Sequence, residues 1–216
     1  MKNIRVKICC ISSESEAQKA IGYGAAALGL VGKMPSGPGV IDDELIKTIS
    51  ANVPPPVATF LLTSETRAVD IVAHYKKVGT TTIQLVDAIP ANDYSLIRHS
   101  LPHVKLVQVI HVINKQSIDE ALEVAQYADA LLLDSGNPNL AIKQLGGTGR
   151  THNWVLSRKI REQIKIPLFL AGGIGAHNVA EAIETVEPFG IDLCSSVRTN
   201  GLLDEHKLAA FFKALV

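Results

Sequence analysis

The stretch Val6-Lys7-Ile8-Cys9-Cys10-Ile11 decides how the rest of the chain is interpreted. It is short, rich in β-branched residues and mostly apolar, which is typical of a strand covered on both faces. It ends in a thiol instead of a turn residue. In a parallel α/β barrel, catalytic groups lie at the carboxyl ends of the strands, so Cys9 is a candidate catalytic residue.

The same design repeats along the chain, because short apolar runs alternate with segments that have the pattern of helices. The runs cover residues 5–11, 26–32, 57–63, 81–87, 104–112, 128–135, 166–173 and 190–197. Strands alternating with helices imply a parallel sheet, and eight such units are the number that closes a barrel. We therefore predict a single-domain (βα)8 TIM barrel over residues 1–216. A doubly wound open sheet is the alternative, but it usually has a glycine-rich turn after its first strand, and Ile11-Ser12-Ser13 has no glycine.

Composition excludes several classes of function. The chain has 21 Lys plus Arg and 21 Asp plus Glu, so it lacks the basic excess of proteins that bind nucleic acids or anionic membranes. It has no apolar run of about 18 residues that would span a membrane. Its three cysteines, two of them adjacent, do not indicate a disulfide framework, and the start of the chain lacks the apolar core of a signal peptide. We expect a cytoplasmic protein.

Two neighbouring strand ends predict a phosphate site. The seventh run ends in Gly172 and Gly173, and the eighth ends in Ser195 and Ser196. Glycines allow a phosphate to approach backbone N–H groups closely, and a helix start beside them adds donors and a favourable dipole. The loops after strands seven and eight are the recurrent phosphate position of these barrels. The alternative is that the two glycines only turn the chain.

The sixth run, Leu131-Leu132-Leu133, ends in Asp134. This residue is a candidate proton donor at the barrel mouth, or else a side chain that caps a helix or fixes a loop. Cys9 has an alternative role as a small buried hydrophobe. Strand alternation predicts that Cys10 points away from the barrel interior, and we expect both Cys10 and Cys194 to serve packing. The long segments 33–40 and 136–152 would lie at the same barrel end, where long loops are often functional.

Several motifs occur in order along nearly the whole chain. They are Lys7-Ile8-Cys9, Leu131–Ser135, Gly146-Gly147-Thr148-Gly149 with Trp154, Leu170–Gly173 with Asn178-Val179, and Asp192 with Ser195. Together they resemble the phosphoribosylanthranilate isomerase family of tryptophan biosynthesis. The resemblance implies an Amadori rearrangement of N-(5'-phosphoribosyl)anthranilate to the aminoketose 1-(2-carboxyphenylamino)-1-deoxyribulose 5-phosphate. It also implies a phosphorylated small-molecule substrate, no metal or organic cofactor, and a monomer or homodimer.

The resemblance assigns roles to individual residues. Asp134 would be the general acid that protonates the ribose ring oxygen, and Cys9 the general base that removes the C2' proton. This chemistry needs a raised pKa for Asp134 and a lowered pKa for Cys9. Gly147 is expected to contact the substrate. Lys7 shares the strand face of Cys9, so it is a candidate to supply positive potential near the substrate, or else a structural lysine of the barrel interior.

The chain departs from the family's pattern at the end expected to hold the aromatic acid. In the family, Ser-Pro-Arg follows the second strand, and its arginine meets the anthranilate carboxylate; residues 36–39 here read Ser-Gly-Pro-Gly. We expect Arg198, or else Lys33, to supply that charge, with a solvated surface arginine as the alternative. Two other functions remain open: an isomerase or lyase for another sugar phosphate, and a barrel that binds a phosphorylated ligand without turnover. Retained Cys9 and Asp134 argue against the last, because binding alone requires neither.

Overall fold

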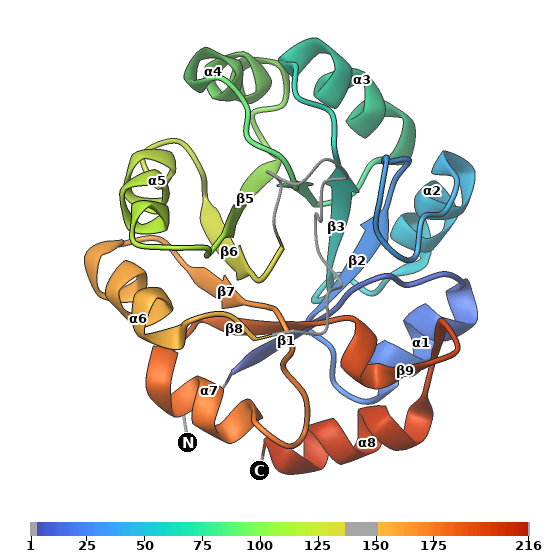
Figure 1. Cartoon of the computed structure of the whole chain (residues 1–216). Helices are drawn as coiled ribbons and strands as arrows, with labels where there is room; N and C mark the ends of the chain where they lie inside the picture. Colours follow the sequence, from blue (N-terminus) through green and yellow to red (C-terminus); the bar gives the residue numbers. More distant parts are fainter. Residues whose placement is uncertain (1–3, 137–150, 216) are drawn as a thin grey trace.

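Eight parallel strands form a closed barrel in sequence order, which confirms the predicted TIM barrel (Figure 1). The computed structural model describes residues 4–136 and 151–215. The first and last strands pair directly, with Lys7 opposite Asp192, and this pairing closes the ring. The strands are β1 Arg5–Ile8, β2 Ala27–Val31, β3 Ala58–Thr63, β4 Thr82–Leu85, β5 Lys105–His111, β6 Ala130–Asp134, β7 Leu168–Leu170 and β8 Gly190–Leu193.

Helices surround the barrel on its outside (Figure 1). They are α1 Glu14–Gly22, α2 Asp43–Asn52, α3 Ala68–Val78, α4 Ala91–Ser100, α5 Gln116–Val124, α6 Trp154–Gln163, α7 Val179–Val186 and α8 Glu205–Ala214. Side chains cap several helix starts; for example, Ser13 accepts a hydrogen bond from the Glu16 N–H, and Asp42 accepts one from the Leu45 N–H. The sequence of residues 63–78 has the pattern of a helix that begins at Thr63, but this prediction is wrong, because Thr63 ends β3 and α3 begins at Ala68.

The core has two parts, and both follow from the strand pattern. Aliphatic side chains that point outward from the strands pack against the helices, while a second set fills the barrel interior. In the interior, Phe60 and Phe169 meet edge to face with ring centroids 6.0 Å apart. Gly190 makes room for this packing, since a Cβ there would lie 2.7 Å from the Phe169 ring. Side chains therefore fill the barrel interior at this level, and a pocket opens at the carboxyl ends of the strands.

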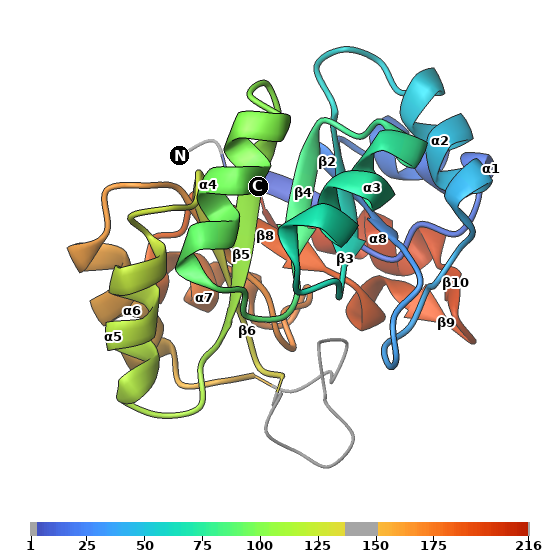
Figure 2. The same ribbon diagram turned by 90° about the horizontal axis from the view of Figure 1, so that it is seen from above.

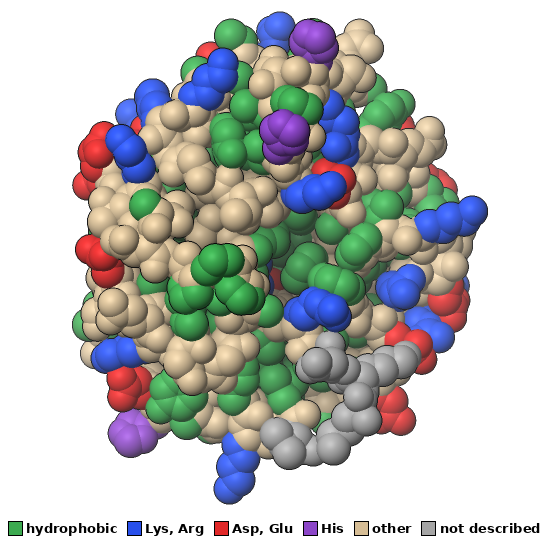
Figure 3. Space-filling model, turned by 180° about the vertical axis from the view of Figure 1, so that it is seen from behind, with side chains coloured by type: hydrophobic (Ala, Val, Ile, Leu, Met, Phe, Trp, Pro, Cys, Tyr) green, Lys and Arg blue, Asp and Glu red, His purple; other side chains and the backbone are tan. Residues whose placement is uncertain are grey.

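The carboxyl ends of the strands mark one end of the barrel. The loop after β2 and the chain leaving β6 both extend from that end (Figure 2). The opposite face carries Lys, Arg and acidic side chains mixed around its rim, in keeping with the balanced charge of the sequence (Figure 3). Within the described residues, no helix has the length and apolar character needed to cross a membrane.

The segment after β8 has structure that the sequence analysis did not predict. A short 3-10 helix, η1 (Ser195–Val197), is followed by a two-stranded hairpin of β9 (Arg198–Thr199) and β10 (Leu202–Leu203). Asn200 and Gly201, at the tip, both have positive φ, of 51° and 81°. This hairpin folds back toward α1 and thereby decides where Arg198 lies.

Candidate active site

A pocket opens at the carboxyl ends of the strands and collects most of the predicted site residues. Its lining includes Cys9, Asp134, Gly172, Gly173, Ser195 and Ser196. Two of the predicted residues within the described part of the chain are not among those that line it. Lys7 and Arg198 lie elsewhere in the structure, and Gly147 lies outside the described residues.

Cys9 directly follows β1, and its backbone N–H donates to the carbonyl of Leu193 at 2.7 Å. The side chain is only 5% exposed. A hydrogen bond from the Cys10 thiol and the nearby Lys7 ammonium together lower the pKa of Cys9, although burial opposes them. A thiol with a lowered pKa is the state that a general base requires.

Lys7 is fully buried in the barrel, and its Nζ lies 2.8 Å from Oδ1 of Asp192. Burial alone would lower the pKa of this lysine, but the negative charges of Asp192 and Cys9 outweigh it and raise the pKa above its ordinary value. Lys7 is therefore a fixed interior cation. The structure does not support its predicted contact with substrate, since it is absent from the pocket lining, but it places its charge beside the Cys9 thiol.

Asp134 ends β6 on the same pocket. Its Oδ1 accepts a 2.7 Å hydrogen bond from the Ser135 N–H, and the side chain is 8% exposed. Burial raises the pKa of Asp134, and the hydrogen bonds from Ser135 and the charge of Lys7 oppose only part of that rise. The two candidate catalytic groups thus have pKa values shifted in the directions that their roles demand, toward a neutral acid and an ionised thiol.

The predicted phosphate end has the backbone geometry of an anion cradle. Gly172 and Gly173 both have positive φ, of 82° and 64°, and a Cβ on Gly172 would lie 3.0 Å from the Ser135 backbone nitrogen. Asn178 holds this turn, donating to the Gly173 carbonyl at 3.0 Å and accepting from the Gly175 N–H at 2.8 Å. Opposite them, the buried Ser196 hydroxyl has no hydrogen-bond partner within the described parts of the chain.

The predicted packing role of Cys10 and Cys194 is confirmed, because Cys10 belongs to the core cluster inside the barrel and Cys194 packs against that cluster. The predicted direction of Cys10, away from the barrel interior, is wrong, because both residues also line the pocket. Cys10 lies beyond the end of β1 and has a φ of 63°, so strand alternation no longer fixes its direction. Its Sγ lies 2.7 Å from the Sγ of Cys194. The site therefore contains a cluster of three free thiols from two neighbouring strand ends.

Arg198 is not the substrate anchor that we predicted. Its guanidinium donates to both carboxylate oxygens of Glu16 at 3.1 Å, to the Cys9 carbonyl at 3.2 Å and to the Cys10 carbonyl. The hairpin after η1 turns Arg198 behind the end of β1 and away from the pocket. Lys33, the other candidate, is exposed and does not line the pocket. Among the described residues that line the pocket, none is Lys or Arg.

Two further residues of the site were not identified from the sequence. Gln84 of β4 lines the pocket, and its Oε1 is buried with no hydrogen-bond partner in the described structure. Gly29 of β2 makes room for the catalytic thiol, since a Cβ there would lie 2.8 Å from the Cys9 Sγ and 3.0 Å from the Lys7 Nζ. A polar residue or a glycine inside an otherwise apolar strand is the signal that was available for both.

We predict that Gly29→Ala lowers kcat by at least about tenfold, because the added methyl group must displace the Cys9 side chain, and small misplacements of reacting groups are costly. Gly22→Ala is the matched control, because no atom lies within 4 Å of a Cβ built there. Steady-state kinetics and thermal melts of both variants check this. Equal kcat values for the two folded variants would contradict it.

Comparison with known proteins gives the family. Residues 6–214 match the family described as N-(5'-phosphoribosyl)anthranilate (PRA) isomerase. This chain belongs to the PRA isomerase family. The resemblance inferred from its motifs is thereby confirmed, and so is its assignment as an enzyme.

Individual relatives agree with the family over almost the whole chain. N-(5'-phosphoribosyl)anthranilate isomerase from Nostoc punctiforme is 34% identical, with 98% of each chain covered. N-(5'-phosphoribosyl)anthranilate isomerase 2 from Methanosarcina mazei is 33% identical over 96% of this chain and 92% of its own.

Solved structures of the PRA isomerase family share the fold. The Thermotoga maritima phosphoribosylanthranilate isomerase superposes with a TM-score of 0.82 at 28% identity, covering 98% of both chains. A second structure, with a TM-score of 0.80 and 26% identity over 98% of this chain and 97% of its own, is a complex with reduced 1-(o-carboxyphenylamino)-1-deoxyribulose 5-phosphate. Membership in this family indicates that the pocket at the strand ends is the active site of an isomerase.

Proposed function

We propose that this chain isomerises N-(5'-phosphoribosyl)anthranilate to 1-(2-carboxyphenylamino)-1-deoxyribulose 5-phosphate in tryptophan biosynthesis. The observation that carries the proposal is the pairing of Asp134 and Cys9 on one pocket with pKa values shifted in opposite directions. Neither shift is needed for a site that only binds a ligand. Both are needed for a reaction that gives a proton to one atom and takes a proton from another.

In the first step, the neutral Asp134 donates its proton to the ribose ring oxygen as the C1'–O bond breaks. The electron pair on the anthranilate nitrogen forms the C=N bond of an open-chain Schiff base. The Cys9 thiolate then removes the C2' proton, and the electrons of that C–H bond neutralise the iminium nitrogen, giving an enolamine. Tautomerisation to the ketone completes the rearrangement, and no atoms are gained or lost.

Lys7, which does not line the pocket, and Asp192, which does, support this chemistry. The buried ammonium stabilises negative charge at Cys9, while its ion pair with Asp192 keeps it in place at 2.8 Å. Because Lys7 and Cys9 are both buried, the attraction between the ammonium and the thiolate is weakly screened.

The substrate phosphate is proposed to lie between Gly172–Gly173 and Ser195–Ser196. The left-handed glycines present backbone N–H groups without side chains in the way, and the Ser196 hydroxyl lacks a hydrogen-bond partner in the described structure. α7 begins at Val179, directly after the turn held by Asn178, and adds the positive end of its dipole. We further propose a cytoplasmic enzyme that acts as a monomer or homodimer.

Loss of anthranilate-substrate fluorescence by the purified chain tests the function, together with growth of a tryptophan auxotroph that lacks the isomerase. We expect turnover and rescue, with inorganic phosphate raising KM by competition. An inactive but folded chain that still binds phosphate would overturn the proposal. It would favour another phosphorylated aminoaldose as substrate, which is the alternative suggested by the absence of Lys and Arg from the described pocket lining.

A further inference from the structure

The mechanism above uses one of the three thiols at the pocket and leaves two without a role. Cys10 and Cys194 come from the ends of neighbouring strands, 184 residues apart in sequence, and their Sγ atoms are 2.7 Å apart. Two uncharged sulfur atoms in ordinary packing stay farther apart than this. No group of three or more His, Cys, Asp or Glu in the described residues is suited to a metal ion.

The backbone holds this pair together from both sides. Cys9 N–H bonds the Leu193 carbonyl, so the chain segments that carry Cys10 and Cys194 leave the barrel side by side. Arg198 donates a hydrogen bond to the Cys10 carbonyl while it is also paired with Glu16, and these two contacts hold the backbone of Cys10 in place. On the far side, Gly39 packs so closely that a Cβ there would lie 2.5 Å from the Cys10 Cβ.

We propose that Cys10 and Cys194 form a reversible disulfide at the rim of the pocket, with a low-molecular-weight disulfide as the oxidant. Both residues line the pocket, so a small oxidant reaches them by the route that substrate takes. A cytosolic environment keeps most thiols reduced, and disulfides that form there are typically transient or regulatory.

The exchange balances in two steps. The Cys194 thiolate attacks one sulfur of the small disulfide R–S–S–R, which releases one thiolate and leaves a mixed disulfide on Cys194. The Cys10 sulfur then displaces the second R–S⁻ and forms the Cys10–Cys194 bond. The two protein thiols lose two electrons and two protons overall, and the small disulfide gains both to become two R–SH.

The bond has a consequence for the reaction that rests on the proposed function. The Cys10 thiol is the hydrogen-bond donor that does most to lower the pKa of Cys9. A sulfur atom in a disulfide has no hydrogen to donate, so burial then raises the pKa of Cys9 with less opposition. A higher pKa leaves a smaller fraction of Cys9 as thiolate, so we expect the rate at neutral pH to fall.

The test incubates the full chain with oxidised and reduced glutathione at a series of ratios, followed by acid quenching, alkylation of free thiols and peptide mapping. We expect a cross-link between the peptides that carry Cys10 and Cys194, loss of two hydrogens from the intact mass, and full reversal by excess reduced glutathione. A glutathione adduct on Cys9 without that cross-link, or no cross-link at any ratio, would overturn the proposal.

Variants separate the thiol chemistry from the function. In Cys194→Ser and, independently, Cys10→Ser, the cross-link must disappear, and the activity of the oxidant-treated variant must return to near that of the same variant kept reduced. A variant that stays as sensitive to the oxidant as the parent chain would refute the assignment. Peptide mapping needs no turnover. A chain that forms the cross-link but never isomerises the anthranilate substrate would therefore contradict the proposed function and still support the disulfide.

Discussion

Asp134→Asn is expected to lower kcat by about 10²–10⁴-fold, because an amide of the same shape cannot donate the proton that opens the ribose ring. The side chain is buried and accepts hydrogen bonds only from Ser135 among the described residues, so the substitution changes little else. Asp70→Asn is the control, since this aspartate is exposed on α3, outside the barrel. Activity of the Asp134 variant within tenfold of the parent chain would remove Asp134 from the mechanism.

The dependence of kcat/KM on pH distinguishes a lost acid from a general loss of structure. The reaction needs protonated Asp134 and ionised Cys9, so the parent chain should give a bell-shaped profile. Asp134→Asn should abolish the limb that falls as pH rises, because no acid is left to deprotonate. Cys9→Ala should abolish the limb that rises with pH, and its residual rate should be lower by a similar factor. A bell that keeps both limbs in either variant would contradict the assignment of that residue.

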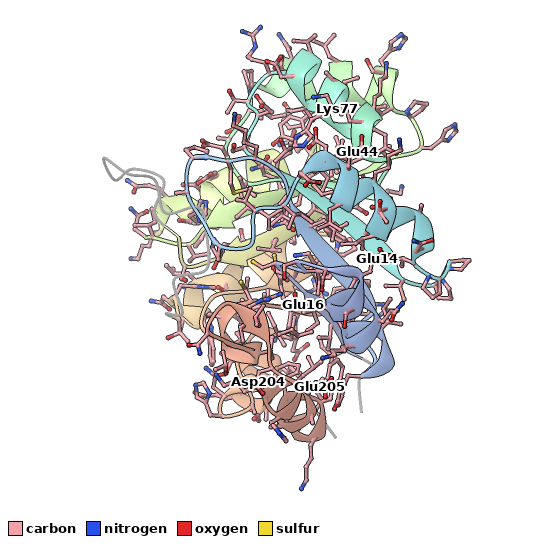
Figure 4. All side chains as sticks on the ribbon, turned by 90° about the vertical axis from the view of Figure 1, so that its right-hand side faces the viewer. Glu14, Glu16, Glu44, Lys77, Asp204 and Glu205 are labelled. Atoms are coloured by element: carbon pink, nitrogen blue, oxygen red, sulfur yellow. The ribbon has the colours of Figure 1, made fainter. Side chains whose placement is uncertain are left out.

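Arg198→Ala is expected to reduce the free energy of unfolding by about 3–5 kcal/mol, the usual cost of leaving a buried charge without its partner. Arg198 and Glu16 are both nearly buried, with side chains 6% and 9% exposed. Figure 4 shows Glu16 on α1, near the segment that follows β8. Arg158→Ala is the matched control, because this arginine pairs with Glu162 and Glu187 on the surface, and such pairs contribute little. Urea unfolding of both variants measures the difference.

The free energy of unfolding lost in Arg198→Ala should depend on pH, in a direction that follows from the pKa of Glu16. Burial would raise the pKa of Glu16, but hydrogen bonds from Arg198 and from the backbone N–H groups of Leu203 and Ser12 outweigh it and lower the pKa. The stability from this pairing is therefore complete above the ordinary pKa of a glutamate and is lost as pH falls through the lowered value. The difference in free energy of unfolding between Arg198→Ala and the parent chain should become smaller at acidic pH. A gap that is constant with pH would mean that the charge of Glu16 does not contribute.

The barrel and the reactive pair were predictable because both depend on local pattern. The apolar runs alternate with helical segments along the whole chain, and Cys9 and Asp134 lie near the ends of two runs, so strand direction alone places them at one mouth of the barrel. Their shifted pKa values followed from the chemistry that the family resemblance implied. Neither inference required knowledge of how distant segments pack, beyond the rule that parallel strands point the same way.

The errors lie where the chain leaves regular structure. Alternation along a strand predicts side-chain direction only within the strand, so it failed for Cys10, one residue past Cys9 and in a left-handed conformation. Arg198 was misplaced because a short 3-10 helix and a hairpin intervene, and neither has a clear hydrophobic period. Its partner, Glu16, looked like an ordinary acid near a helix start.

The Glu16–Arg198 pair joins residues 182 positions apart, and Arg198 also bonds the backbone carbonyls of Cys9 and Cys10. A ribosome must therefore release nearly the entire polypeptide before the base that performs proton abstraction acquires its final position. The early strands and helices have partners close in sequence and are expected to assemble as they are synthesised. The catalytic site is complete only after β8 and Arg198 have been synthesised. Nascent fragments that end before β8 should be compact and yet chemically silent.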